Sequence, residues 1–396
     1  MTSARPILGL SCAHLVTDLY TPIIPAILPL LIIQYGYPYL LAGLFITVFQ
    51  VTSSLAQPFI GWLYDVRGRA VHVSASIILC ATCIPAIGLM TDYYAILLCA
   101  ALGGLGHALF HPSAFGTVSR IAPDHSRGRL TAYFVVGGNF GYAIGPVIAA
   151  VMVGLFGLKG ISLLFFPGIL TAVALWRILP DPAATILQQQ GDARGAAAGE
   201  SHRGVALVVA GSACRAWAIS ASIAFLPTLL ITRGMELVGA NMLVSGMLLA
   251  GVAGQITGGI ISDRIGRKEY TLAGLLASVP MFLLFITTTG TVAVIALILF
   301  GFFLWSTFSV TVAMAHELMP SRAGLVSGLV LGLAVGTGGA GVAVTGLLAD
   351  SYGLGEGFAL LLLPILAALA VFASVPYPLR LLESAAGRLV KKERSR

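Results

Sequence analysis

Two pairs of ionisable residues lie inside apolar segments of this sequence. His14 and Asp18 are four residues apart in the first segment. His107 and His111 have the same spacing in the fourth. Residues at this spacing share a helix face, and a carboxylate held beside an imidazole can load and release a proton. We therefore expect Asp18, His14 and His111 to handle protons; the alternative is a static hydrogen bond that fixes helix packing.

The same residues also have the chemistry of metal ligands. Imidazole nitrogens and a carboxylate oxygen from His14, Asp18, His107 and His111 could form a four-ligand site. Metal sites of this kind usually show a denser pattern of His and Asp, and no His-rich loop is present. We expect neither a bound metal nor any other cofactor, with metal binding kept as the alternative.

Arg215 lies in the middle of the seventh apolar segment. An ionisable group in hydrocarbon is costly and indicates function by default. Arg215 could pair with Asp18 or receive an anionic group of a solute, because guanidinium binds carboxylate and phosphate-like oxygens well. A fixed structural pair is the alternative. The predicted solute-binding residues are Arg215, Asn139, Gln50, His107, Trp217, Tyr142 and Trp305.

The composition indicates that lipid surrounds much of the chain. Of 396 residues, 58% are hydrophobic and only 9% are charged, against about 25% charged in soluble domains. Apolar segments of about twenty residues recur, the length of a membrane-spanning helix. The sequence predicts an all-α membrane protein with twelve transmembrane helices. We expect spans near 7–33, 40–63, 73–90, 94–118, 130–156, 160–178, 205–231, 238–261, 271–289, 291–315, 324–349 and 357–377.

The sequence also repeats itself. Gly61 and Asp65 recur as Gly259 and Asp263, an offset of 198 residues, which is half the chain. Two six-helix bundles related by pseudo-symmetry follow from this repeat. The predicted parts are an N-terminal bundle (1–179), a cytoplasmic linker (180–204), a C-terminal bundle (205–379) and a basic cytoplasmic tail (380–396).

Basic residues predict the orientation. The net charge is +7, but the basic residues lie in short loops between apolar segments, so we exclude a nucleic-acid partner. The loops on one side hold only Lys159 and Arg233. The side rich in Lys and Arg is cytoplasmic by the positive-inside rule. We expect a multi-pass protein of the inner (plasma) membrane with both termini in the cytoplasm.

The loops after the second and eighth spans carry a related charged motif. A glycine allows close helix packing, and a carboxylate can bind an arginine or a helix N-terminus. Such a cluster can hold one conformation and release it in another; a generic charged loop is the alternative. The predicted gating residues are Asp65, Arg69, Asp263, Arg267, Gly61 and Gly259.

These loops resemble the signature loop of the major facilitator superfamily, and the chain is most similar to its fosmidomycin-resistance group. Further matching segments are 14–18, 49–58, 110–112 and 137–141. The resemblance implies the major facilitator fold and gives Asp65 the signature-loop role. Residues 141–146 resemble part of a glycine–proline motif of exporters, although the glycine pair expected further on is missing.

Together, these features predict a secondary active transporter. The resemblance implies proton-coupled antiport, so we expect efflux of a small drug-like or anionic metabolite, as in antibiotic resistance. The alternatives are an importer or symporter of a small organic anion, a metal-ion transporter and a non-transporting solute sensor. The sequence lacks hydrolase and metalloprotease motifs, so we expect no enzyme. The expected partners are a small-molecule solute, protons and the lipid bilayer, and the expected state is a monomer.

Overall fold

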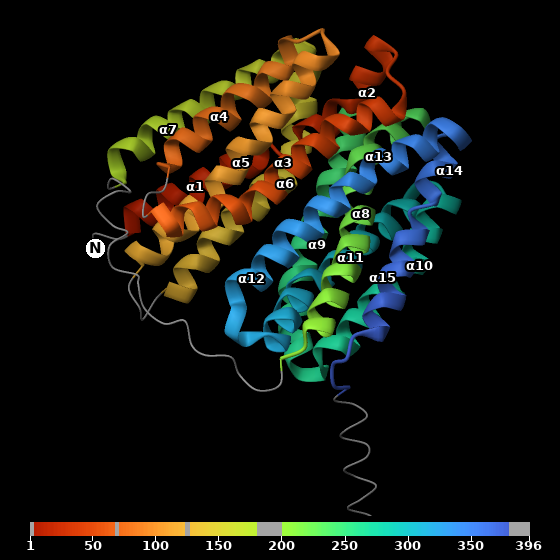
Figure 1. Cartoon of the computed structure of the whole chain (residues 1–396). Coiled ribbons are helices and arrows are strands. Elements are labelled where there is room, and N and C mark those ends of the chain that lie inside the picture. Colours follow the sequence, from red (N-terminus) through yellow and green to blue (C-terminus); the bar gives the residue numbers. More distant parts are fainter. Residues whose placement is uncertain (1–3, 68–70, 123–126, 180–199, 380–396) are drawn as a thin grey trace, which may run out of the picture. The chain divides into compact units, whose positions relative to one another are not determined.

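A computed structural model gives the fold and describes residues 4–67, 71–122, 127–179 and 200–379. Those residues form helices and connecting turns, with no strand among them (Figure 1). The helices of the first half are α1 (Ala4–Leu19), α2 (Ile23–Tyr35), α3 (Tyr39–Arg67), α4 (Val73–Ala86), α5 (Tyr93–Ile121), α6 (Arg127–Phe156) and α7 (Phe165–Ile178). The helices of the second half are α8 (His202–Thr232), α9 (Leu237–Ile265), α10 (Arg267–Thr287), α11 (Gly290–Leu318), α12 (Ala323–Ser327), α13 (Ala334–Tyr352), α14 (Leu354–Ala359) and α15 (Leu362–Ser374).

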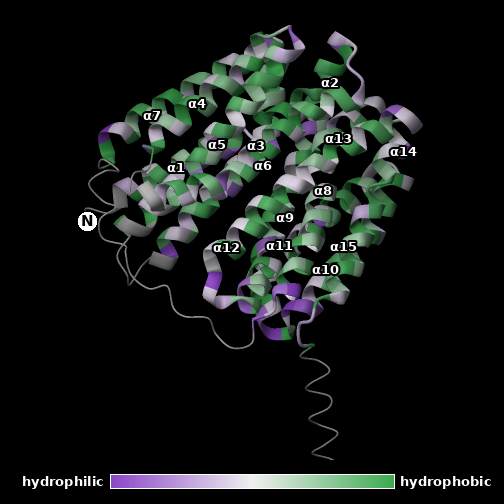
Figure 2. Cartoon of the chain, in the orientation of Figure 1, coloured by the Kyte–Doolittle hydropathy of each residue, from purple (hydrophilic) through white to green (hydrophobic). Residues whose placement is uncertain are grey.

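The predicted membrane spans are confirmed as helices. Within the described residues, 11 helical stretches are long and apolar enough to cross a membrane, and the shorter apolar helix Val73–Leu89 occupies the predicted third span. Hydrophobic residues run along these helices (Figure 2). Some spans combine several elements: α1 and α2 form the first, and a π-helical turn (Gly328–Leu333) joins α12 to α13 in the eleventh. The predicted all-α fold with twelve apolar helices is therefore correct.

The helix boundaries agree with the internal repeat. Helix α3 runs from Tyr39 to Arg67 and α9 from Leu237 to Ile265, both 29 residues long. Adding the offset of 198 to the first pair of boundaries gives the second pair. The repeat seen in the loop motif thus extends over the whole helix that precedes each loop.

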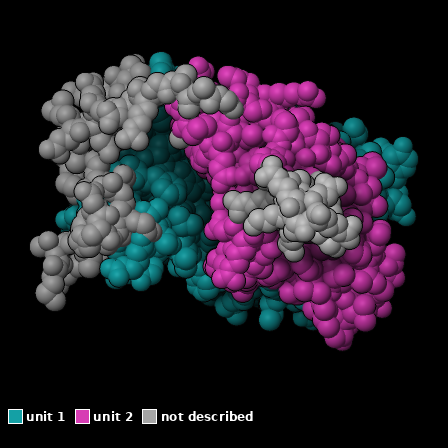
Figure 3. Space-filling model, turned by 90° about the horizontal axis from the view of Figure 1, so that it is seen from below, with its two compact units in different colours: residues 1–192, 220–246, 339–360 teal, residues 193–219, 247–338, 361–396 magenta. Residues whose placement is uncertain are grey.

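The described chain divides into two compact units (Figure 3). Unit 1 comprises Met1–Asp192, Ser220–Gly246 and Gly339–Leu360. Unit 2 comprises Ala193–Ile219, Met247–Gly338 and Leu361–Arg396. Most of the predicted linker and all of the basic tail lie outside the described residues, so the predicted division at these segments stays a prediction.

Candidate functional site

The first membrane span is broken beside Asp18. Helix α1 ends at Leu19 and α2 begins at Ile23. Pro22 has no N–H, so it cannot donate to the carbonyl oxygen four residues before it. The Asp18 carbonyl instead accepts a hydrogen bond from the Thr21 amide at 3.1 Å. The break therefore places Asp18 in the last turn of α1, within the span.

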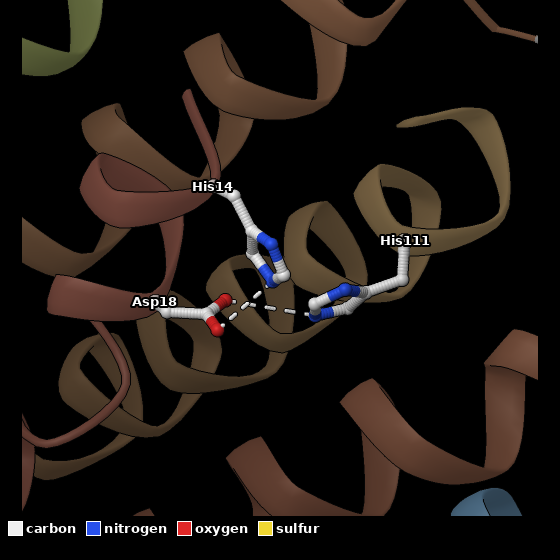
Figure 4. A group of neighbouring side chains, drawn as sticks. All are labelled: His14, Asp18 and His111. Carbon is white, nitrogen blue, oxygen red and sulfur yellow. Dashed lines mark ion pairs between the residues drawn. The ribbon is translucent and has the colours of Figure 1, made fainter. Parts of the chain in front are cut away.

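Three histidines surround the Asp18 carboxylate in unit 1. His14 Nε2 lies 3.1 Å from Oδ2 of Asp18. From α5, His107 Nε2 and His111 Nε2 lie 3.4 and 3.7 Å from Oδ1. The two α5 histidines also contact each other, with 3.1 Å between their Nε2 atoms. Figure 4 shows the side chains of His14, Asp18 and His111 pointing toward one another. The structure thus brings together both pairs expected from the sequence.

A hydrogen bond to the backbone determines which ring nitrogen of His14 carries a hydrogen. His14 Nδ1 is 2.8 Å from the backbone carbonyl of Phe134 on α6. A carbonyl oxygen can only accept, so Nδ1 carries a hydrogen and donates it. In a neutral ring, Nε2 would then be an acceptor facing the Asp18 carboxylate, which is also an acceptor. The 3.1 Å contact therefore requires one shared proton, on either His14 or Asp18.

Apolar rings separate this cluster from water. Side-chain exposure is 6% for His14 and 14% for Asp18. The Phe134 ring stacks on His14 with 4.2 Å between centroids, and Phe110 and Phe115 lie nearby. Low polarity strengthens the attraction between an imidazolium and a carboxylate. Gain or loss of a proton by the cluster therefore changes the electrostatic attraction between His14 and Asp18 strongly.

Glycines on α6 allow α1 to approach closely enough to form the cluster. A Cβ at Gly138 would lie 2.3 Å from His14 Nε2. At Gly141 it would lie 2.0 Å from the Leu15 carbonyl oxygen, and at Gly145 2.6 Å from that of Leu19. Small residues permit such close backbone packing in membranes. The sequence segment 137–141 therefore seats α1 and fixes the position of the His14 ring.

Replacement of Gly138 by Ala is expected to displace the His14 ring, because the added methyl group has no room. Overpacking of this kind typically costs about 1–3 kcal/mol, so the thermal unfolding midpoint in detergent should fall. Gly61→Ala is the matched control, since a Cβ at Gly61 meets nothing within 4 Å. Equal midpoints for the two variants would contradict the close seating of α1 on α6.

The predicted solute-binding residues of unit 1 are partly gathered. A cavity with room for about one water molecule lies beside the start of α2 and is lined by Gln50 and Tyr142, among other residues. Asn139 is half-buried on α6 and is not among the lining residues. Gln50 and Tyr142 thus border one cavity, and the assignment of Asn139 to a solute site stays a prediction.

Arg215 is buried in unit 2, where only 2% of its surface is exposed. Its Nη1 donates to Thr307 Oγ1 at 3.0 Å, and the guanidinium lies over the Phe308 ring at 5.2 Å from the centroid. Its buried Nε has no hydrogen-bond partner. Within its own unit, no described carboxylate forms an ion pair with Arg215. Pairing of Arg215 with Asp18 would join the two units and stays a prediction.

The two tryptophans expected at the solute site differ in packing. Trp305 is half-buried, and a Cβ at Gly251 would lie 1.7 Å from its ring. Trp305 therefore packs directly on the glycine of α9. Trp217 is also half-buried on α8. Contact of either ring with a solute remains a prediction.

The charged loop between α9 and α10 forms a network in unit 2. Arg267 contacts Asp263 at 2.6 Å and Glu317 at 3.2 Å, and it donates to Ser262 at 2.9 Å. Tyr377 donates a hydrogen bond to Glu317. The predicted contact between a signature-loop carboxylate and an arginine thus exists in the second repeat. Tyr377, beyond the last helix, was missed because its spacing from the loop carries no signal.

A second contact holds the residues before α8 against the turn that follows α11. The Ser321 amide donates to Glu200 Oε1 at 3.1 Å, and the Ser321 hydroxyl donates to the same oxygen. The hydroxyl hydrogen bond lowers the pKa of Glu200. The C-terminal end of the predicted linker therefore contacts the turn after α11.

Close packing at the predicted gating glycines is not found. Among the described residues, a Cβ at Gly61 would meet nothing within 4 Å, and one at Gly259 only Ser309 at 3.7 Å. The tight approach falls one residue earlier, where a Cβ at Gly258 would lie 2.1 Å from the Ser306 carbonyl oxygen. In the second repeat, Gly258 and not Gly259 therefore makes the close approach to α11, and a gating role for Gly61 and Gly259 stays a prediction. The Asp65 side chain and Arg69 lie outside the described residues.

The cluster in unit 1 also meets a geometric requirement for metal binding. One ligand atom each from His14, Asp18 and His111 lie within 4.8 Å of one another. Zn²⁺ binds nitrogen and oxygen at about 2.0–2.1 Å in a tetrahedron, which separates neighbouring ligands by about 3.3 Å. The separation of His14 Nε2 from Asp18 Oδ2 is similar, at 3.1 Å, and His111 Nε2 lies 3.7 Å from the other carboxylate oxygen, Oδ1. The alternative of metal binding is thus compatible with the geometry.

Comparisons with known proteins agree with this architecture. The family model described as Major Facilitator Superfamily matches residues 8–340 and 208–394. The chain is 32% identical to the fosmidomycin resistance protein of Escherichia coli K12. The alignment spans 364 residues and covers 88% of each chain. It is 28% identical to the uncharacterized MFS-type transporter YfnC of Bacillus subtilis, over 93% of each chain.

Solved structures show the same fold. A bacterial homologue of the human lysosomal transporter Spinster matches with a TM-score of 0.83 at 16% identity, covering 94% of this chain and 96% of the other. The nucleoside transporter NupG matches with a TM-score of 0.73 at 13% identity, covering 94% and 100%.

Proposed function

Because the chain belongs to the Major Facilitator Superfamily of transporters, we propose that it exports a small anionic or drug-like molecule in exchange for protons. Transport proceeds by alternating access. The observation that carries the proposal is the buried cluster of Asp18 with His14, His107 and His111, in which the 3.1 Å contact requires a shared proton. A group of this kind inside a membrane span is costly and functional by default.

The groups that face the cluster define its proton chemistry. Asp18 is its only carboxylate among the described residues, so it is the anionic member. Tyr142 on α6 and Cys80 on α4 are near enough to interact with it electrostatically. With the shared proton present, the His14–Asp18 pair carries no net charge, and loss of that proton leaves the Asp18 carboxylate facing the lone pair of His14 Nε2. These two charge states couple proton movement to the conformation of α1 and α5.

Arg215 supports an anionic solute. A buried guanidinium without a carboxylate in its own unit carries an uncompensated charge, which is costly. An anionic group that binds the free Nε would compensate the charge and satisfy the donor. A relative at 32% identity is named a fosmidomycin resistance protein, and we propose fosmidomycin as the first solute to test.

The experiment is uptake into proteoliposomes that contain the purified full-length protein. With the lumen acidic relative to the bath, proton efflux should drive fosmidomycin inward against its gradient. A protonophore should abolish accumulation, and protein-free liposomes should show none. Accumulation that ignores the pH gradient would contradict proton coupling, and binding without flux would favour the sensor.

A divalent metal ion as the transported species is the second candidate. The separations of the ligand atoms of His14, Asp18 and His111 favour it. The same proteoliposomes, loaded with a zinc-sensitive dye, measure Zn²⁺ entry. Saturable entry that Mg²⁺ does not compete with would support this candidate, and the absence of entry beside working fosmidomycin exchange would eliminate it.

The proposal includes location and state. Since basic residues are concentrated in the loops on one side, we place both termini in the cytoplasm and the protein in the inner membrane. The loop between α2 and α3, and the one after α13, then face outward. The transporter acts as a monomer, because each chain holds both repeats.

A further inference from the structure

Asp350 connects the two sequence repeats at one end of unit 1. It lies near the end of α13, and its Oδ1 accepts a hydrogen bond from the Tyr39 amide at 2.7 Å. Its Oδ2 accepts from the Leu40 amide at 2.9 Å. Tyr39 and Leu40 are the first residues of α3. Amides at a helix start have no acceptor in their own helix, and the positive end of the helix dipole favours a carboxylate there.

The contact continues along the two helices. A Cβ at Gly346 would lie 2.5 Å from the Tyr39 carbonyl oxygen, and one at Gly43 lies 3.3 Å from that of Val342. Further along, the Thr47 hydroxyl donates to the Gly339 carbonyl at 3.2 Å. Small residues thus let α3 and α13 pack closely, and the carboxylate closes the end of this interface.

We propose that Asp350 is a latch that holds α3 and α13 together at the outer face and releases them when the transporter opens outward. The inference rests on the proposed alternating access. Helix α3 belongs to the first repeat and α13 to the second, so outward opening has to separate them. The latch is reversible because Asp350 is exposed, and water can replace both amides as its hydrogen-bond donors.

Of the two helix interfaces related by the sequence repeat, only the α3–α13 interface has this carboxylate. The offset of 198 maps Asp350 onto Met152, which has no charge. The helix equivalent to α3 is α9, and α6 packs against its start. There, a Cβ at Gly154 of α6 would lie 3.8 Å from the Val238 side chain, which is ordinary van der Waals contact. The carboxylate is therefore a feature of the α3–α13 interface and not a consequence of the repeat.

Asp92 provides a matched control. Its Oδ1 accepts a hydrogen bond from the Ala95 amide at 2.9 Å and caps the start of α5. This cap is local, within three residues, whereas Asp350 joins segments 311 residues apart. Loss of the Asp92 cap should weaken one helix end without changing the contact between repeats.

The test is amide hydrogen exchange of the full-length protein in lipid nanodiscs, without solute. In Asp350→Ala, exchange should become at least about fivefold faster at 39–47 and also at 339–350 on the facing helix. Asp350→Asn should show a smaller increase, since an amide oxygen still caps a helix. Asp92→Ala should raise exchange only near 92–96.

Two outcomes would overturn the latch. Faster exchange confined to Tyr39 and Leu40 would make Asp350 a local cap, and unchanged exchange at all of these segments would remove any role. Because no solute is present, the experiment does not depend on what the protein transports. Failure of fosmidomycin uptake in unaltered protein would count against the proposed function, and the exchange result would stand separately.

Discussion

Asp18→Asn is expected to abolish fosmidomycin accumulation driven by a pH gradient, to the level of protein-free liposomes. The amide keeps the shape of the side chain but neither carries a charge nor takes up a proton. His14 Nε2, 3.1 Å away, would face an uncharged partner, and the shared proton would have no carboxylate to return to. Exchange of labelled for unlabelled fosmidomycin without a gradient should persist, because it needs no net proton movement.

Asp92→Asn is the chemically matched control, since Asn caps the start of α5 as well as Asp does. Its gradient-driven accumulation should equal that of the unaltered protein. Normal accumulation by Asp18→Asn would refute the assignment of Asp18 to proton coupling. Loss of both exchange and accumulation, with a normal unfolding midpoint, would place Asp18 in solute binding instead.

Arg215→Lys is expected to weaken fosmidomycin binding about 10- to 100-fold. Hydrogen bonds to charged groups contribute about 1.5–3 kcal/mol, and an ammonium cannot reproduce the planar fork of a guanidinium. Because lysine keeps the positive charge, the substitution tests the hydrogen-bonding geometry of the side chain and not its charge. Binding is measured by competition with labelled fosmidomycin on protein in nanodiscs at constant pH.

Arg233→Lys gives the corresponding change at an exposed arginine and should leave affinity unchanged. Thr307→Val removes the one hydroxyl that Arg215 contacts and should cause a smaller loss than Arg215→Lys. Unaltered affinity in Arg215→Lys, for fosmidomycin and for other small anions, would make Arg215 a structural residue.

Local features of the candidate site were predictable from the sequence. The spacing of four residues indicated that His14 and Asp18 share a face, as His107 and His111 do, and the 3.1 Å contacts confirm both pairs. The approach of one pair to the other depends on packing between α1, α5 and α6. A single sequence does not specify such packing, because many helix rotations satisfy the same apolar pattern.

Backbone groups account for much of what was missed. The Phe134 carbonyl that orients His14 has no side-chain signature, since every residue has a carbonyl. The contacts of Arg215 within unit 2, with the Thr307 hydroxyl and the Phe308 ring, were not predicted either, and its pairing with Asp18 stays a prediction. The repeat aligns positions along the helices but says nothing about which hydroxyl or ring a side chain reaches.

The capping role of Asp350 was also missed, although an acidic residue at the end of a span is visible in the sequence. A carboxylate at a helix N-terminus was expected in the signature loops. In the second of these loops Asp263 contacts Arg267, and the carboxylate cap was found at α3, where Asp350 binds the Tyr39 and Leu40 amides. Only the tertiary structure shows which helix start a carboxylate reaches.

The break between α1 and α2 divides the first span into two helices joined by a three-residue turn. At the break, hydrogen bonds between residues three apart, from the Tyr20 amide to Thr17 and from the Thr21 amide to Asp18, replace the bonds between residues four apart that run along each helix. The break also packs on α6, because a Cβ at Gly145 would lie 2.6 Å from the side chain of Pro22. A change of angle at the break therefore reaches Asp18 directly, because its carbonyl oxygen accepts a hydrogen bond from the Thr21 amide within that turn.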